Sequence, residues 1–77
     1  MEIELITFGS LTEVIKSQKI HLDEVNDTDG LKTYLEHSFP ALRQRKYKLA
    51  LNKNLVQEKQ GLRTGDTVAI MPPFSGG

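Results

Sequence analysis

The chain has 77 residues, which is room for one domain and not for two, because folded domains usually need at least about 50 residues each. Ten Lys and Arg balance ten Asp and Glu, whereas nucleic-acid binders usually carry a clear positive excess, so we expect no nucleic-acid partner. The absence of cysteine excludes a disulfide, a thiolate nucleophile and a cysteine-based metal site.

The N-terminal residues lack the features of a targeting segment. They are acidic and pass directly into an alternating pattern, without the basic region and apolar run of a signal peptide. No apolar stretch approaches the roughly 18 residues of a membrane span. We therefore expect a soluble, cytoplasmic protein with no membrane partner.

The first part of the chain predicts two strands around a short helical segment. In residues 2–8, apolar and β-branched side chains alternate between two faces, and Gly-Ser ends the run. Residues 10–16 carry apolar side chains at helical spacing, which indicates a short helix or turn. Residues 20–25 alternate again and predict a second strand at an edge of the sheet.

One main helix is predicted from residue 28 onward. The Asn-Asp-Thr-Asp-Gly at residues 26–30 offers side-chain oxygens that cap the free amides of a helix start. An apolar stripe follows, and Pro40 ends it by biasing the preceding residue away from helical angles. Because one helix must cover the sheet of so small a domain, we favour a core-facing stripe over a partner-binding groove.

The remaining residues predict three further strands. Residues 47–51 are strand-like, and Asn-Lys-Asn at 52–54 predicts a hairpin turn into a short strand at 55–56. The two glycines of residues 61–66 indicate a turn with positive φ, and residues 67–71 form the last strand. This order predicts an α+β fold in which one main helix packs on one face of a mixed sheet.

The sequence contains none of the usual motifs of an independent enzyme. Neither histidine has the spacing of a metal ligand, the glycines form no phosphate-binding loop, and no serine has a hydrolase context. The basic run Arg-Gln-Arg-Lys-Tyr-Lys at residues 43–48 is either a docking patch or a solvated helix end, and we favour the latter. We expect no metal site, no permanently bound cofactor and no catalysis by the chain alone.

The last six residues, Pro-Pro-Phe-Ser-Gly-Gly, differ from the rest of the chain. The prolines lack N–H donors, so we expect a domain over residues 1–71 and a flexible, projecting arm over residues 72–77. Extended, this arm reaches at most about 20 Å. Two terminal glycines let a narrow channel admit the backbone, and they arise by chance only about one time in 200.

Several stretches resemble the small, sulfur-carrying subunit of molybdopterin synthase. They are Leu-Ile-Thr-Phe-Gly at 5–9, Leu-Ala-Leu-Asn at 49–52, and Leu-Arg-Thr-Gly-Asp-Thr-Val at 62–68 with the ending that follows. The resemblance covers nearly the whole chain, and the Pro-Pro-x-x-Gly-Gly ending is its most specific part. Met71 departs from the family, which often has an aromatic residue there.

The resemblance implies a ubiquitin-like β-grasp fold and a sulfur carrier in molybdenum cofactor biosynthesis. A separate E1-like enzyme would use ATP to convert the carboxylate of Gly77 into a transient acyl-adenylate, which a sulfide equivalent would turn into a thiocarboxylate. The arm, threaded through Gly76, would then enter the large subunit and donate sulfur to the cyclic pterin precursor. The family also suggests a heterotetramer of two small and two large subunits.

The resemblance further implies where the large subunit docks. Apolar residues at positions matching Phe8, Leu55 and Met71 form the family's interface beside the root of the arm. The alternative is that all three complete the core; it is an equal one for Leu55 and a weaker one for Phe8, because Ile3, Leu5 and Thr7 already define the opposite face of that strand. The rest of the predicted partner-binding set consists of the arm residues Pro72, Pro73, Phe74 and Ser75.

Three other functions fit parts of the same sequence. A sulfur carrier of thiamine synthesis or tRNA thiolation would share the Gly-Gly end, but thiamine-pathway carriers usually lack the paired prolines. A ubiquitin-like modifier would form an isopeptide bond through Gly77. A plain interaction module would lose no activity on removal of Gly76 and Gly77.

Overall fold

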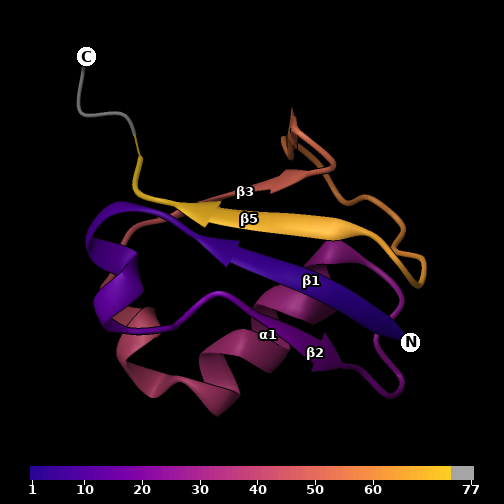
Figure 1. The fold of residues 1–77 in the computed structure, drawn as a ribbon, viewed down its shortest axis with the longest axis horizontal. Coiled ribbons are helices and arrows are strands. Elements are labelled where there is room, and N and C mark those ends of the chain that lie inside the picture. The colour runs from indigo at the N-terminus through magenta and orange to yellow at the C-terminus, as the bar shows by residue number, and fades with distance from the viewer. Residues whose placement is uncertain (74–77) are drawn as a thin grey trace.

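The computed structural model describes residues 1–73. Within them, five strands form one mixed sheet and a single α-helix packs on one of its faces (Figure 1). The strands are β1 (Glu2–Thr7), β2 (Gln18–His21), β3 (Lys48–Leu51), β4 (Asn54–Leu55) and β5 (Thr67–Met71). The helices are α1 (Thr28–Ser38) and two short 3-10 helices, η1 (Gly9–Glu13) and η2 (Pro40–Gln44).

The strands lie in the order β2-β1-β5-β3-β4. The pair β1–β5 is parallel and the other three pairs are antiparallel, so strands from the two ends of the described chain lie side by side within the sheet (Figure 1). The strand β2 lies at an edge, as predicted. The predicted α+β class, with one main helix on a mixed sheet, is therefore confirmed.

The second strand differs from its prediction over residues 20–25. It begins earlier, because Gln18 pairs with Leu5 of β1. It also ends earlier, at His21, and the chain then turns through Glu24, whose φ of 62° lies in the left-handed region. The alternating burial still holds, since both Ile20 and Leu22 are buried.

The predicted hairpin connects β3 to β4, but its turn has two residues instead of the predicted 52–54, because Asn54 already pairs with Leu51 as the first residue of β4. Asn52 and Lys53 have φ of 48° and 76°, as a hairpin turn of the primed type requires. The side chain of Asn52 also accepts the N–H of Thr67 at 2.9 Å, which ties this turn to the start of β5. Of the two glycines predicted to have positive φ before β5, Gly65 has it, at 94°, and Gly61 does not.

The helix α1 begins where the capping cluster predicted. Asp27 is its N-cap, and its carboxylate accepts the N–H of Gly30 at 2.8 Å. The helix ends at Ser38, two residues before the proline that was expected to stop it. Leu31 and Leu35 are fully buried, which confirms that the apolar stripe faces the core.

The core lies between α1 and one face of the sheet. Its buried members come from both layers and from the connecting segments: Ile3, Leu5, Leu11, Ile15, Ile20, Leu22, Leu31, Leu35, Leu42, Leu49, Leu62, Val68 and Ile70. Thr7 completes the inner face of β1, and its backbone N–H donates to the hydroxyl oxygen of Ser17 at 2.9 Å. Since alternate residues of a strand point to opposite faces, the other residues of these strands form the outer face of the sheet.

Candidate functional site

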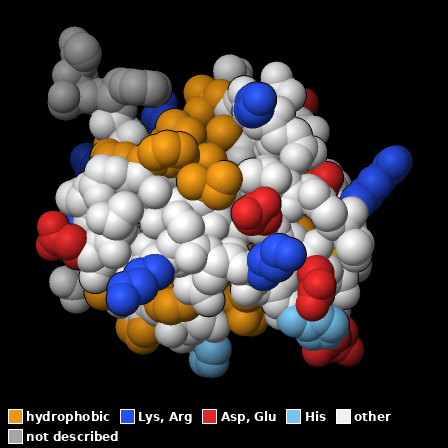
Figure 2. Space-filling view, viewed as in Figure 1, with side chains coloured by type: hydrophobic (Ala, Val, Ile, Leu, Met, Phe, Trp, Pro, Cys, Tyr) orange, Lys and Arg blue, Asp and Glu red, His pale blue; other side chains and the backbone are white. Residues whose placement is uncertain are grey.

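The outer face of the sheet carries a row of apolar side chains that crosses four strands. Ile6 of β1 pairs with Ala69 of β5, Ala69 pairs with Ala50 of β3, and Ala50 pairs with Leu55 of β4. Directly paired residues project from the same face of a sheet, so these four form one continuous row. Figure 2 shows apolar side chains gathered on the visible surface near the end of β5.

An open hollow of about 570 Å³ lies over the part of this row formed by Ile6, Ala69 and Ala50, and Leu55 does not line it. Phe8 and Met71 line it together with Ile6, Ala50 and Ala69. Its remaining lining is polar and comes from Glu4, Asn52, Lys53 and Thr67. An apolar centre with a polar margin is the usual anatomy of a protein–protein interface, so this hollow is the best candidate for a docking surface among the described residues.

Two of the three predicted docking residues lie together, and the third lies apart. Phe8 directly follows β1, and Met71 is the last residue of the neighbouring strand β5. Leu55 lies in β4 at the edge of the sheet. Phe8 is 49% exposed and Leu55 is 42% exposed, while Met71 is half-buried. The core alternative for Leu55 is therefore wrong, because its side chain is on the surface. The docking role of all three remains a prediction.

The chain leaves the sheet between β1 and β3 (Figure 1). Met71, the last residue of β5, pairs with Lys48 of β3. Pro72 and Pro73 follow and are half-buried. The other predicted arm residues lie outside the described part of the chain, and their roles stay predictions: Phe74, Ser75, Gly76 and Gly77.

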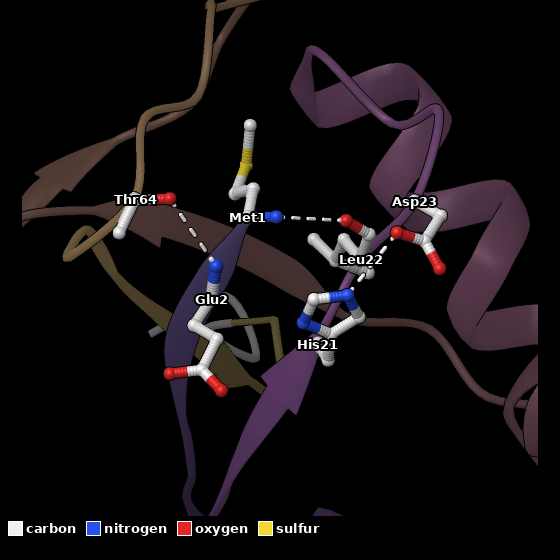
Figure 3. Close-up of polar contacts among 6 residues, drawn as sticks. All are labelled: Met1, Glu2, His21, Leu22, Asp23 and Thr64. Atoms are coloured by element: carbon white, nitrogen blue, oxygen red, sulfur yellow. Dashed lines mark hydrogen bonds and ion pairs between the residues drawn. The ribbon is translucent and has the colours of Figure 1, made fainter.

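Polar contacts on the surface connect the residues at the other end of the sheet, where β1 begins and β2 ends (Figure 3). The amino group of Met1 donates to the carbonyl oxygen of Leu22 at 3.1 Å, and the ring of His21 lies 3.1 Å from the carboxylate of Asp23. His21 is exposed, and so is His37 on α1, so both histidines lie on the surface. Among residues 1–73 there is no cluster of His, Cys, Asp or Glu that fits a metal ion, and no helix long and apolar enough to span a membrane.

The basic run at residues 43–48 is anchored by one aromatic side chain. The hydroxyl of Tyr47 donates to the carboxylate of Glu36 on α1, and the amino group of Lys32 lies 5.6 Å from the centre of the Tyr47 ring. Burial, and secondarily the Glu36 carboxylate, raise the pKa of Tyr47 well above its usual range. The other residues of this run are exposed; as predicted, those at 43–46 lie at the end of η2 and in the loop after it, whereas Lys48 begins β3.

Comparison with known protein families identifies the family of this chain. Residues 5–77 match the model of the ThiS family, which is nearly the whole chain. The chain belongs to the ThiS family. This ThiS-family chain is also 35% identical to the molybdopterin synthase sulfur carrier subunit of Chlamydomonas reinhardtii, over 83 aligned positions that include all of both chains.

Solved structures have the same fold as this ThiS-family chain. The molybdopterin converting factor subunit 1 of Pyrococcus furiosus has a TM-score of 0.83 and 17% identity, over 94% of this chain and 97% of that one. A chain from the complex of subunits 1 and 2 of the Helicobacter pylori molybdopterin-converting factor has a TM-score of 0.76 and 28% identity, over all of both chains. The predicted β-grasp fold and the family resemblance are thus both confirmed.

The sequence pattern missed part of the candidate surface. Alternation in residues 2–8 sets Ile6 on the same face as Phe8, but nothing in the sequence distinguishes Ala50 and Ala69, because small apolar residues are common in both core and surface positions. The available signal was the alternation of β3 and β5, which sets both alanines opposite to Leu49 and Ile70. Their juxtaposition with Ile6 required the pairing of three strands.

Proposed function

We propose that this chain is the sulfur carrier of molybdopterin synthase and that its own terminal carboxylate carries the sulfur. The observation that supports this most strongly is the 35% identity, along all of both chains, with the sulfur carrier subunit of Chlamydomonas reinhardtii. The Pro-Pro-x-x-Gly-Gly ending supports the same assignment over a thiamine-pathway carrier. The chemistry then needs no catalytic side chain on this protein, because the reacting group is the end of the main chain.

The proposed cycle begins with activation of Gly77. A carboxylate is a poor electrophile, so a separate E1-like enzyme would bind ATP and form an acyl-adenylate on Gly77, with release of pyrophosphate. A sulfide equivalent would then attack the carbonyl carbon, and AMP would leave with the electron pair of the broken C–O bond. The resulting thiocarboxylate stores one sulfur atom on the chain end. No resident cofactor is required on the carrier, and the acyl-AMP is transient.

The proposed acceptor of the sulfur lies in the large subunit of the synthase. The Helicobacter pylori relative, 28% identical, was solved as a complex of subunits 1 and 2, which supports a large-subunit partner here. Docking of the outer face beside Phe8 and Met71 would bring the arm to that partner's active site, where Gly76 and Gly77 would be threaded. Because the thiocarboxylate would be held next to its acceptor in a fixed orientation, the transfer would proceed as an effectively unimolecular step. We further infer a heterotetramer with two copies of each subunit.

The test is intact mass spectrometry of the protein purified from its native cell. We expect a fraction of the chains to be heavier by the difference between sulfur and oxygen, with the change located on Gly77. Addition of the large subunit and the pterin precursor should discharge this mass and form molybdopterin. Adducts of Gly77 on lysine side chains in the same cells would instead indicate a protein modifier. Discharge only to a thiamine or tRNA acceptor would indicate one of the other carriers.

A further inference from the structure

Gly9, the first residue of η1, packs against the first residue of the arm. A Cβ atom built on Gly9 would lie 2.9 Å from Cγ of Pro72 and 3.4 Å from Cδ of the same ring. Carbon atoms in favourable contact are about 3.5–4.0 Å apart, so a side chain at Gly9 requires the proline ring to move. The absence of a side chain at Gly9 therefore makes room for the ring of Pro72.

The turn at Gly9 is held in place on both sides. The N–H of Phe8 donates to the carbonyl oxygen of Ile70 at 3.0 Å, which fixes the preceding residue to β5. The carbonyl oxygen of Gly9 accepts the hydroxyl of Thr12 at 2.8 Å, which fixes the turn to η1. Gly9 itself has φ of 60°, in the left-handed region. The contact surface offered to Pro72 is therefore anchored rather than loose.

Pro72 and Pro73 cannot donate hydrogen bonds to the neighbouring strands. The strand β5 is paired up to Met71, which lies opposite Lys48. Pro72 and Pro73 have no N–H, so neither can donate a hydrogen bond that would extend the pairing to β1 or β3. Beyond Met71, packing of the Pro72 ring against Gly9 therefore constrains the chain where hydrogen-bond donation no longer can.

We propose that Gly9 is a positioning residue for the C-terminal arm: its missing side chain seats the ring of Pro72 and so sets the direction in which the arm leaves β5. This rests on the proposed function, in which the arm delivers a thiocarboxylate to the large subunit. When the partner's channel holds the arm extended over about 20 Å, a change of direction by 10° at its root displaces its tip by about 3.5 Å. A misplacement of only about 1 Å at a reacting atom can lower a rate about 100-fold.

Gly65 provides a matched control for Gly9. It has positive φ as well, at 94°, but no atom lies within 4 Å of a Cβ built on it. Asparagine tolerates the left-handed region better than most residues, so Gly9→Asn and Gly65→Asn introduce the same side chain with limited backbone strain. Only the substitution at Gly9 places a side chain against Pro72.

The experiment uses the full chain with its thiocarboxylate installed chemically, by cleaving an intein thioester with sulfide, so that no activating enzyme is needed. Single-turnover sulfur transfer is measured at saturating large subunit, and the dissociation constant of the complex is measured in parallel. We expect Gly9→Asn to slow transfer at least about tenfold and to change the dissociation constant less than about threefold. Gly65→Asn should stay within about twofold of the wild type in both.

A second substitution tests whether Gly9 acts through the proline ring. Pro72→Ala removes both ring atoms that a Cβ at Gly9 would meet. The variant with both Gly9→Asn and Pro72→Ala should therefore be no slower than Pro72→Ala alone, because the clash no longer exists. If the two losses instead multiply, the substitutions act independently and the assignment is wrong.

Other outcomes also decide the matter. Normal transfer by Gly9→Asn, or equal slowing by Gly65→Asn, overturns the role of Gly9 and leaves the sulfur-carrier function intact. A wild-type thiocarboxylate that transfers no sulfur overturns the proposed function and the role of Gly9 with it. If Gly9→Asn does not fold in a urea titration, Pro72→Ala and Pro73→Ala decide instead: we expect Pro72→Ala to be the slower, and equal rates contradict the proposal.

Discussion

The backbone N–H of Phe8 donates to the carbonyl oxygen of Ile70 at 3.0 Å, so the pairing of β1 with β5 extends one residue beyond the end of β1. This bond holds Phe8 next to Met71 over the hollow of the outer face. Half of the Phe8 side chain is exposed there, at 49%. Aromatic side chains that become buried at the centre of an interface commonly contribute most of its binding free energy.

Replacing Phe8 by alanine should weaken the complex with the large subunit. Burial of a phenylalanine contributes about 1.5–3 kcal/mol, which corresponds to a roughly 10- to 150-fold higher dissociation constant. Calorimetry measures the affinity, and unfolding in urea measures the stability of the same variant. His37→Ala, at an exposed position of α1 on the other layer, is the control and should bind normally. A Phe8→Ala protein that unfolds easily but binds with wild-type affinity would assign Phe8 to the core instead.

Two leucines distinguish stability from docking. Leu35 of α1 is fully buried, whereas Leu55 of β4 is 42% exposed. Leu35→Ala should lower the free energy of unfolding by about 2–5 kcal/mol, because it leaves a cavity in the core. Leu55→Ala should lower it by less than about 1 kcal/mol and should weaken binding of the large subunit. Unfolding in urea and calorimetry give both quantities, and normal binding by Leu55→Ala would remove this residue from the docking surface.

The carboxylate of Gly77 must be free for activation. In the proposed mechanism, residues appended after Gly77 would remove the terminal carboxylate from this position and would not pass a channel fitted to glycine, so the extended chain should acquire no thiocarboxylate. Its unfolding midpoint should equal that of the wild type, because no core residue changes. Intact mass spectrometry after incubation with the activating enzyme, ATP and a sulfur donor provides the measurement. Thiocarboxylation of an unprocessed, extended chain would refute the mechanism.

Side chains added at the two terminal glycines should affect transfer and not folding. Gly76→Val or Gly77→Val adds bulk where, in the proposed mechanism, the backbone approaches the active site closely, so the rate of molybdopterin formation should fall at least about tenfold. The thermal midpoint should stay within about a degree or two, as for surface substitutions generally. A much lower midpoint would mean that these residues pack on the domain, and the threading role would then be wrong.

Tyr47 should make stability depend on pH only in the alkaline range. Burial, followed by the Glu36 carboxylate, raises the pKa of Tyr47 in the folded state above its unfolded value of about 10. The folded state therefore holds this proton more tightly, and the resulting stability is fully present below about pH 10 and is lost as the pH rises further. Tyr47→Phe carries no such proton and should lose less stability than the wild type above that pH. The free energy of unfolding of both proteins is measured in urea from about pH 9 to about pH 12, on both sides of the unfolded pKa of about 10. An equal decrease in the two proteins would contradict this prediction.

Local features of the chain were determined by the sequence alone. The cap at Asp27, the end of α1 before Pro40 and the hairpin turn at Asn52 and Lys53 all follow from interactions within a few residues. The inner face of β1 follows from its period of two, which also leaves Phe8 outside. The ending of the chain and the family resemblance likewise lie in the sequence itself.

Other features were decided only by the tertiary structure. The sequence of one strand does not specify which strands become its neighbours. The row from Ile6 through Ala69 and Ala50 to Leu55 therefore forms only when β1, β5, β3 and β4 are paired. The contact of Gly9 with Pro72 likewise joins segments far apart in the chain. Periodicity specifies which face a side chain takes, but the register between distant strands depends on how the whole core packs, and that is a property of the folded chain.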